Sequence, residues 1–493
     1  MSADASEEEP LWLGIDLGTQ SVRALAVSER GRVAGSGSHP LESRRDGPRH
    51  EQDPEQWWEA LCCASRGALG DLAPERIEGM AMAGTSGTIL LLDSEGAPLT
   101  PGLMYDDSRA AEQARRIDEA GPTPSSSAAL PISSQWALPK LLWMLDERPD
   151  PPRGARLAHQ PDFIARRLVG HEVPADCSHA LKTGYDLLEE RWPHELLESL
   201  GVPDGLLPSV VRSGSLLGTV GSEAARQTGI AAGTPLIAGM TDGCAAQLAA
   251  GALSEGDWNS ALGTTLVLKG VSPHPIRDPS GVLYSHRAPG GGWLPGGASS
   301  TGAGILSATF FERDLDALAR RAARHERTNL LAYPLLSRGE RFPFAAPDAE
   351  GFLLGRPADE GEHFAALLQG LAYVERLCFD YVDLLGAPSG GGVSLTGGAT
   401  RGRYLCQLRA DVMGRALRLP ENPEPALGMA MLAASGDRPI AAAAAGMVRL
   451  REVIEPRPDH VRHFHEPYAR LVGELEARGW LGSELADHAR GRL

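Results

Sequence analysis

LWLGIDLGTQ, residues Leu11–Gln20, is an apolar run that ends in Leu-Gly-Thr, and WNSALGTT, residues Trp258–Thr265, ends in the same way. A second apolar run follows each turn, Val22–Val27 after the first and Leu266–Gly270 after the second. Short apolar runs on either side of a small-residue turn are typical of a β-hairpin. The two stretches are separated by about half of the 493-residue chain. We interpret them as a duplicated hairpin that begins each of two similar domains.

The residues after the first hairpin predict more strands and a helix. Arg32–Gly37 is expected to be a third strand, and Asp53-Pro54-Glu55 to start a helix, because Asp is a favoured cap and Pro suits the first turn. Ile77–Ala83 and Thr88–Leu92 are the next predicted strands. The result is a β-meander that opens an α/β chain.

The second half of the chain continues this alternation. Thr234–Met240 is predicted to be a buried strand that runs through Asp242 into a helix, Cys244–Gly251. Gly392–Leu395 is predicted to be a strand, with a helix from about Tyr404. From Ile440 two helical segments are expected to form an accessory tail. Alternating strands and helices predict an α/β fold class.

Composition excludes several classes of protein. There are 47 Lys and Arg against 64 Asp and Glu, a net charge of −17, and an acidic surface repels nucleic acids and anionic membranes. Leu236–Leu253 is the longest apolar candidate and is interrupted by Asp242, so no membrane span is expected. Met1–Pro10 is acidic, unlike a signal peptide, and the six cysteines form no C-x-x-C pair. We therefore predict a cytoplasmic protein without nucleic-acid or membrane partners.

The common catalytic signatures are also missing. The chain has three lysines, Lys140, Lys182 and Lys269, and none lies in a P-loop or in the V-A-I-K strand of protein kinases. The sequence contains neither G-x-S-x-G nor H-E-x-x-H, so the usual hydrolase and zinc-peptidase motifs are excluded.

The two Gly-Thr turns are candidate phosphate sites. A turn such as Gly18-Thr19 or Gly263-Thr264 directs backbone N–H groups and a hydroxyl at one point, which suits an anion. A single Gly-Thr is equally typical of an ordinary hairpin turn. Gly397-Gly398 follows a predicted strand and allows a ring or ribose to approach the backbone, although it is also a common route from strand to helix.

Two aspartates are candidates for the chemistry. Asp16 ends the first buried strand, where a carboxylate can bind Mg²⁺ through water or can cap the amides of the turn. Asp242 lies between a strand and a helix, where it can accept a proton from an attacking hydroxyl or serve as the helix N-cap.

Taken together, these motifs resemble the FGGY carbohydrate kinases, a branch of the actin/hexokinase/Hsp70 superfamily. The resemblance covers nearly the whole chain and rests on segments at suitable spacing. They are Gly14–Ser21, Asp53–Trp58, Lys140–Glu147, Gly239–Gly243, Ser260–Thr265, Gly339–Pro343, Thr396–Ala399 and Glu424–Gly428.

The resemblance implies two ribonuclease H-like (actin-like ATPase) domains with a central cleft, closing on MgATP and a sugar. The domains would comprise residues 11–243 and 244–436, followed by a helical tail at 437–493. Asp16 would serve Mg²⁺ and a sugar hydroxyl, and Ser86 and Asp242 would bind the sugar, with Asp242 as the base. The nucleotide would be held by Gly18, Thr19, Gln20, Gly263, Thr264, Gly397, Gly398 and Arg401, the last at a position where related ribulose kinases tend to carry Asn.

Within the family, Gly84–Thr88, Tyr105–Arg109 and His159–Asp162 are most similar to a D-ribulose kinase group once described as xylulose kinase-like. The expected reaction is therefore ATP-dependent phosphorylation of the terminal hydroxyl of a ketopentose, D-ribulose before D-xylulose. A non-catalytic sugar or nucleotide sensor on the same fold, and an actin-like or chaperone ATPase, are the alternatives. A homodimer is possible on this interpretation.

Overall fold

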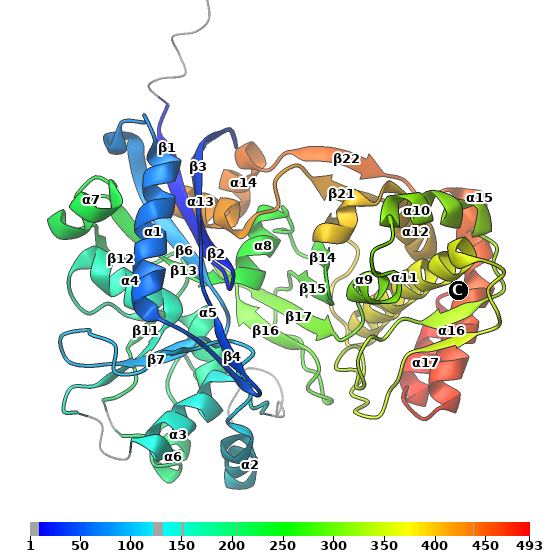
Figure 1. Ribbon diagram of the computed structural model, residues 1–493, viewed down its shortest axis with the longest axis horizontal. Helices are drawn as coiled ribbons and strands as arrows, with labels where there is room; N and C mark the ends of the chain where they lie inside the picture. Colours follow the sequence, from blue (N-terminus) through cyan, green and yellow to red (C-terminus); the bar gives the residue numbers. More distant parts are fainter. Residues whose placement is uncertain (1–8, 122–131, 149–151, 204, 437) are drawn as a thin grey trace, which may run out of the picture. The chain divides into compact units, whose positions relative to one another are not determined.

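The computed structural model describes residues 9–121, 132–148, 152–203, 205–436 and 438–493, so most of the acidic segment Met1–Pro10 lies outside the described residues. The chain forms two compact units (Figure 1). Unit 1 comprises Met1–Gly251, His286–Gly292 and Asn422–Arg449. Unit 2 comprises Ala252–Ser285, Trp293–Glu421 and Leu450–Leu493.

Unit 1 is built on a six-stranded sheet in which the predicted hairpin is central. Its strands, in spatial order, are β12 (Leu216–Thr219), β13 (Pro235–Thr241), β6 (Ile77–Gly84), β1 (Leu11–Leu17), β2 (Ser21–Ser28) and β3 (Val33–Pro40). β1 runs antiparallel to β2 and parallel to β6, and β13 is also parallel to β6. The hairpin and the strands predicted beside it are confirmed.

Unit 2 repeats this arrangement in a seven-stranded sheet. Its strands, in spatial order, are β16 (Tyr284–Arg287), β17 (Trp293–Ser299), β15 (Leu266–Gly270), β14 (Trp258–Leu262), β20 (Val393–Thr396), β21 (Leu417–Pro420) and β22 (Leu450–Ile454). β14 runs antiparallel to β15 and parallel to β20, which is parallel to β21. Six strands of this sheet correspond in order and direction to those of unit 1. They are β17, β15, β14, β20, β21 and β22, which match β3, β2, β1, β6, β13 and β12. The duplication inferred from Leu-Gly-Thr therefore extends to the topology.

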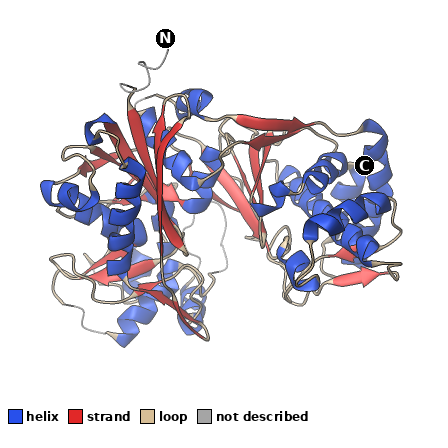
Figure 2. Cartoon of the chain, turned by 45° about the horizontal axis from the view of Figure 1, so that its top comes forward, coloured by secondary structure: helices blue, strands red, loops and turns tan. Residues whose placement is uncertain are grey.

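Helices accompany the sheet in each unit (Figure 2). In unit 1, α1 (Pro54–Leu69) begins after Asp53, whose side chain accepts from the N–H of Glu55, and it packs Trp57 and Leu61 into the core. The other helices of unit 1 are α2 (Ala111–Ala120), α3 (Ala137–Glu147), α4 (Gln160–Val169), α5 (Cys177–Ala180), α6 (His194–Ser199), α7 (Ser222–Thr228), α8 (Asp242–Ala249), α13 (Pro425–Ser435) and α14 (Ile440–Met447).

The helix α13 belongs to unit 1 although it follows most of unit 2 in the sequence. It packs against β1 so closely that a Cβ on Gly14 would lie 1.7 Å from the carbonyl oxygen of Ala426. Contacts of this kind return residues 422–449 to the first unit, so the units are discontinuous. The contiguous division at 11–243, 244–436 and 437–493 remains a prediction.

The core of unit 2 is organised by α11 (Glu360–Leu384), a helix that is buried along most of its length. The other helices of this unit are α9 (Gly304–Thr309), α10 (Leu315–Ala322), α12 (Arg403–Met413), α15 (Pro458–Val461), α16 (His465–Ala477) and α17 (Ser483–Gly491). Phe464 and Tyr468 are fully buried in the same core as α11. The segment after Ile440 therefore differs from the expected pair of accessory helices: strand β22 joins the sheet, and the last helices complete a core.

Smaller sheets complete the two units. Five strands, in the order β4 (Arg44–Asp46), β5 (Arg49–Gln52), β8 (Gly102–Leu103), β7 (Ile89–Leu92) and β9 (Arg156–His159), form a second sheet in unit 1. Two-stranded pairs join β10 (Ala175–Asp176) to β11 (Val210–Val211) and β18 (Leu331–Tyr333) to β19 (Phe352–Leu354). Within the described ranges, no helix combines the length and hydrophobicity needed to cross a bilayer.

Candidate active site

Three predicted site residues of unit 1 lie at the carboxyl ends of neighbouring parallel strands. Asp16 is in β1, Ser86 follows β6 and Asp242 follows β13. The register aligns them, because Leu17 and Thr241 both pair with Gly84. The carboxyl edge of a parallel sheet is where ligands bind in open α/β folds. The fold therefore gathers at one edge residues that are 70 and more positions apart.

The carboxyl group of Asp16 lies in an unusual environment. Burial, and then the charge of Asp242, raise the pKa of Asp16 to about 7, against the opposing effect of Arg23. The effect of Asp242 is consistent with the register, which places the ends of β1 and β13 on either side of Gly84. Asp16 Oδ1 is buried and has no hydrogen-bond partner among the described residues. The amide of Gly18 bonds instead to the carbonyl of Ser21, at 3.1 Å, so Asp16 does not cap that amide.

Asp242 is the first residue of α8 and not its N-cap, which is Thr241. Its Oδ1 accepts a hydrogen bond from the amide of Gly243 at 2.7 Å, which fixes the carboxylate beside the helix N-terminus. The strand end before it is also held, because the amide of Thr241 donates to Ser178 Oγ at 3.2 Å. Ser178, which sequence reasoning missed, lies as close to His286 Nδ1, a residue assigned to the same unit.

The loop that carries Ser86 is held through its carbonyl groups. His179 Nε2 donates to the carbonyl of Gly84 at 3.1 Å, and Lys182 Nζ donates to that of Ser86 at 3.2 Å. Burial opposes a charge on His179, but Asp176, whose Oδ2 lies 2.6 Å from Nδ1, raises the pKa of this imidazole overall. Ser86 Oγ is buried without a hydrogen-bond partner among the described residues and is therefore available to a ligand.

Tyr105 is a further side chain in the field of Asp242, and Asp106 follows it in the sequence. Burial raises the pKa of Tyr105, and the charges of Asp106 and Asp242 add to the effect. Burial also disfavours the charged form of Asp106, but hydrogen bonds from His50 and Arg45 lower its pKa overall. The sequence signal for these two residues was the motif Tyr105–Arg109, which we used for the family resemblance and not for the site.

In unit 2, Gly263 and Thr264 form the turn between β14 and β15, as predicted. The turn packs against a second glycine segment, since a Cβ on Gly302 would lie 2.2 Å from the carbonyl oxygen of Thr264. The amide of Ala303 also donates to the carbonyl of Gly263 at 2.8 Å. A Cβ on Gly263 would meet nothing within 4 Å, so the outer face of the turn is open.

Glu340 supports the segment behind this turn and was not among the predicted site residues. Its buried carboxylate accepts hydrogen bonds from Ser299 Oγ, Thr301 Oγ1 and the amide of Ser300, at 2.6–3.1 Å. Thr301 in turn accepts from the amide of Leu266 at 2.8 Å. The only sequence signal was its place in the motif Gly339–Pro343.

Gly397 and Gly398 lie at the same sheet edge as the Gly263 turn, because Ala261 pairs with Thr396 across parallel strands. Gly397 has a φ of 85°, and a Cβ there would lie 2.5 Å from the carbonyl oxygen of Leu262. Gly398 has open space around its missing Cβ. Arg401 ends the short 3₁₀ turn that follows, Gly398–Arg401, and is exposed.

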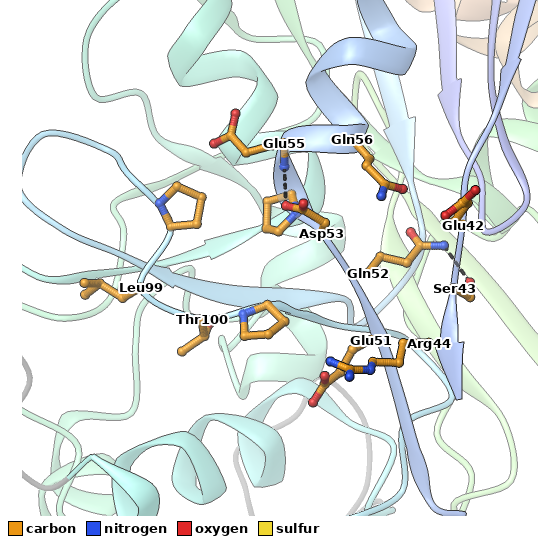
Figure 3. Close-up of a pocket in the computed structure, with 13 residues that line it drawn as sticks. Glu42, Ser43, Arg44, Glu51, Gln52, Asp53, Glu55, Gln56, Leu99 and Thr100 are labelled. Atoms are coloured by element: carbon orange, nitrogen blue, oxygen red, sulfur yellow. Dashed lines mark hydrogen bonds between the residues drawn. The ribbon is translucent and has the colours of Figure 1, made fainter. Parts of the chain in front are cut away.

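The first turn, Gly18–Gln20, is held by Gln52, a residue that lines an open pocket of unit 1. Gln52 Nε2 donates to the carbonyl of Thr19 at 2.7 Å and to Ser43 Oγ, and Figure 3 shows Gln52 and Ser43 in the pocket wall. The pocket measures about 680 Å³, and neither Asp16 nor Asp242 lines it. It is a separate hollow beside the candidate site. No cluster of three or more metal-binding side chains occurs among the described residues.

Comparisons with known proteins agree with this geometry. Residues 11–249 match the N-terminal domain and residues 258–436 the C-terminal domain of the FGGY family of carbohydrate kinases. A xylulose kinase of Streptomyces rubiginosus is 31% identical over 96% of this chain and 97% of that protein. Crystal structures of a "xyloylose kinase" from Brucella ovis (24% identity, TM-score 0.86) and a xylulose kinase from Rhodospirillum rubrum (25% identity, TM-score 0.84) each cover 95% of this chain and 99% of theirs. The predicted two-domain α/β sugar-kinase fold is confirmed.

Proposed function

Because this chain belongs to the FGGY family of carbohydrate kinases, and is thus a phosphotransferase that acts on a sugar hydroxyl, we propose that it phosphorylates D-xylulose with ATP. The names of its relatives support a pentulose kinase and favour D-xylulose. The D-ribulose preference expected from the sequence is not supported by them, and D-xylulose, the alternative, fits better. The cytoplasmic location and the homodimer stay predictions.

The observation that carries the proposal is the pair of carboxylates at one sheet edge, Asp16 and Asp242, with Asp16 Oδ1 buried and without a hydrogen-bond partner among the described residues. On this proposal, the sugar hydroxyl oxygen attacks the γ-phosphorus of ATP, and the bond to the β–γ bridging oxygen breaks. Asp242 orients the hydroxyl and accepts its proton. Ser86 Oγ, which is buried without a partner among the described residues, supplies a hydrogen bond to the sugar.

The residues present also fit a magnesium ion. A buried carboxylate oxygen without a hydrogen-bond partner, Asp16 Oδ1, is the type of donor that Mg²⁺ takes together with water and phosphate oxygens. Asp16 would hold the ion, which when bound neutralises phosphate charge. An ion there would also favour the ionised form of Asp16 over the neutral form that burial favours.

The nucleotide is proposed to bind the glycine-rich turns of both units. The turns Gly18–Gln20 and Gly263-Thr264, with their threonine hydroxyls, are assigned to phosphates, and Gly397, Gly398 and Arg401 to the adenosine side. Fixed backbone dipoles of this kind stabilise phosphate charge without reorganising during the reaction.

ADP release with a panel of acceptors tests the proposal. D-Xylulose, D-ribulose, ribitol, glycerol and a blank without sugar are compared with MgATP, and we expect the highest kcat/KM for D-xylulose. Release that is equal in all samples contradicts the kinase proposal and indicates an ATPase or a sensor. A higher kcat/KM for D-ribulose keeps the pentulose kinase but refutes the choice of D-xylulose.

A further inference from the structure

Lys140 connects two loops that are far apart in the sequence. It lies in α3, its side chain is 0% exposed, and its Nζ donates to the carbonyl of Gly87 at 2.6 Å and to that of Met104 at 2.8 Å. Gly87 follows Ser86, and Met104 precedes Tyr105 and Asp106. The Lys140 side chain therefore connects the loop of Ser86, the proposed ligand of the sugar, to the loop of Tyr105, whose side chain lies in the field of Asp242.

Burial at this position disfavours the charged form of a lysine side chain. Burial, and then the nearby charge of Lys182, lower the pKa of Lys140 to about 7, while Asp107 and Asp106 favour its charged form and Arg109 disfavours it. An amine that is buried without partners is strongly unfavourable, so the two carbonyl bonds are what make it tolerable. Both the ammonium and the neutral amine keep enough N–H groups to donate twice. The connection between the loops is therefore kept on either side of pH 7.

We infer that Lys140 is a positioning residue for the acceptor sugar, because it fixes the distance between the loop of Ser86 and the loop of Tyr105 and Asp106. This inference rests on the proposed function. Lys182 has a narrower role, since it donates only to the first of these loops, at the carbonyl of Ser86. Among the lysines, all of which lie in the described residues, only Lys140 bridges the two loops through hydrogen bonds of its Nζ.

The substitution Lys140→Met tests the inference, because methionine keeps the length of the side chain and removes the donors. We expect the KM for the pentulose to rise at least about tenfold while the KM for ATP stays within about twofold, since both hydrogen bonds of Lys140 Nζ go to loops of unit 1. Lys269→Met is the matched control: Lys269 is also buried, lies in β15 of unit 2 and faces the ring of Tyr284. This control should leave the KM for the pentulose within about twofold of wild type.

Two results overturn the inference. One is a pentulose KM in K140M within twofold of wild type, and the other is an equal rise in both KM values, which indicates general damage to the fold. Lys140→Gln, which retains a shorter donor, should give a pentulose KM between those of wild type and K140M.

A measurement on the wild type keeps the inference testable if neither variant folds. Because the chain has three lysines, lysine labelled with ¹³C at Cε gives three resonances, which K182M and K269M assign by elimination. The Lys140 signal should shift when D-xylulose is added and stay unchanged with a non-hydrolysable ATP analogue.

A signal that does not respond to a sugar that the wild type phosphorylates refutes the inference and leaves the proposed function intact. A wild type without pentulose-dependent ADP release refutes the proposed function instead.

Discussion

Units 1 and 2 share one arrangement of strands but carry opposite chemistry at the carboxyl edge of the sheet. The turn Leu17–Thr19 corresponds to Leu262–Thr264, so the position of Asp16 is occupied by Ala261 in unit 2. Unit 1 thus presents a carboxylate where unit 2 presents a methyl group, next to a glycine turn whose outer face is open. Carboxylates accept protons and repel phosphates, whereas neutral amides attract phosphates. On the proposed function, this difference lets two similar domains serve different substrates, the acceptor sugar and the anionic nucleotide.

The side chains that hold the loops at the carboxyl edges of the two sheets also differ in charge. In unit 1, the cationic donors Lys140, Lys182 and His179 hold a loop by its carbonyl oxygens. In unit 2, the carboxylate of Glu340 holds a loop by its amide and hydroxyl donors. On the proposed function, removal of a support in unit 1 should affect the binding of the sugar, and removal of Glu340 should affect the binding of the nucleotide.

The largest expected effect is that of Asp242→Asn. Asparagine keeps the size of the side chain but cannot accept the proton of the attacking hydroxyl, so we expect kcat to fall roughly a thousandfold while ATP affinity changes little. Steady-state kinetics and calorimetry with the ATP analogue measure the two quantities. A kcat within tenfold of wild type would mean that Asp242 is not the base.

Glu340→Gln should have an intermediate effect on the other unit. The amide replaces a carboxylate oxygen by a donor facing Ser299, Ser300 and Thr301, which are donors themselves, so the segment behind the Gly263 turn should shift. We expect the KM for ATP to rise about tenfold with pentulose affinity nearly unchanged. Ser299→Ala, which removes one of these donors, should produce a smaller rise in the same direction. A change in pentulose KM alone would contradict the division between the units.

The smallest effect concerns stability and pH at Asp16. Its folded-state pKa is about 7 against an ordinary value of 3.8, so the folded protein binds a proton more strongly than the unfolded chain. Stability therefore falls as the pH rises from about 4 to 7 and stays lower above that window. Without ATP and Mg²⁺, Asp16→Asn should raise Tm by a few degrees at pH 8 and leave it unchanged near pH 4.

Thermal unfolding of D16N across this pH range checks the expected sign. Glu78→Gln, at an exposed position of β6 in the same unit, serves as the control and should show no such pH-dependent gain. A D16N variant that is less stable than wild type at pH 8 would show that the buried carboxylate stabilises the unit.

Local sequence patterns predicted much of the fold correctly. The hairpin strands at Leu11, Ser21, Trp258 and Leu266 are where the apolar runs predicted them, because a short apolar run beside a small-residue turn has few other stable forms. The helix after Asp53 follows from its cap and proline. Strand β22 was missed because Leu450–Ile454 is mostly exposed and has no clear apolar pattern, so that only its pairing with β21 makes it a strand.

For the candidate site, residue type alone identified Asp16 and Asp242, since carboxylates at strand ends are rare among apolar residues and have a recognisable use. Their mutual influence on pKa required the parallel pairing of β1, β6 and β13. Lys140, Ser178 and Glu340 had no signal as functional residues, because each acts through hydrogen bonds to residues distant in the sequence or to backbone atoms that every residue shares. The sequence by itself therefore determined the duplicated hairpins and the family, and it named the two aspartates as candidates. The tertiary structure alone decided which side chains hold the loops, since hydrogen bonds to the backbone depend on position in space and not on the identity of the residue that accepts them.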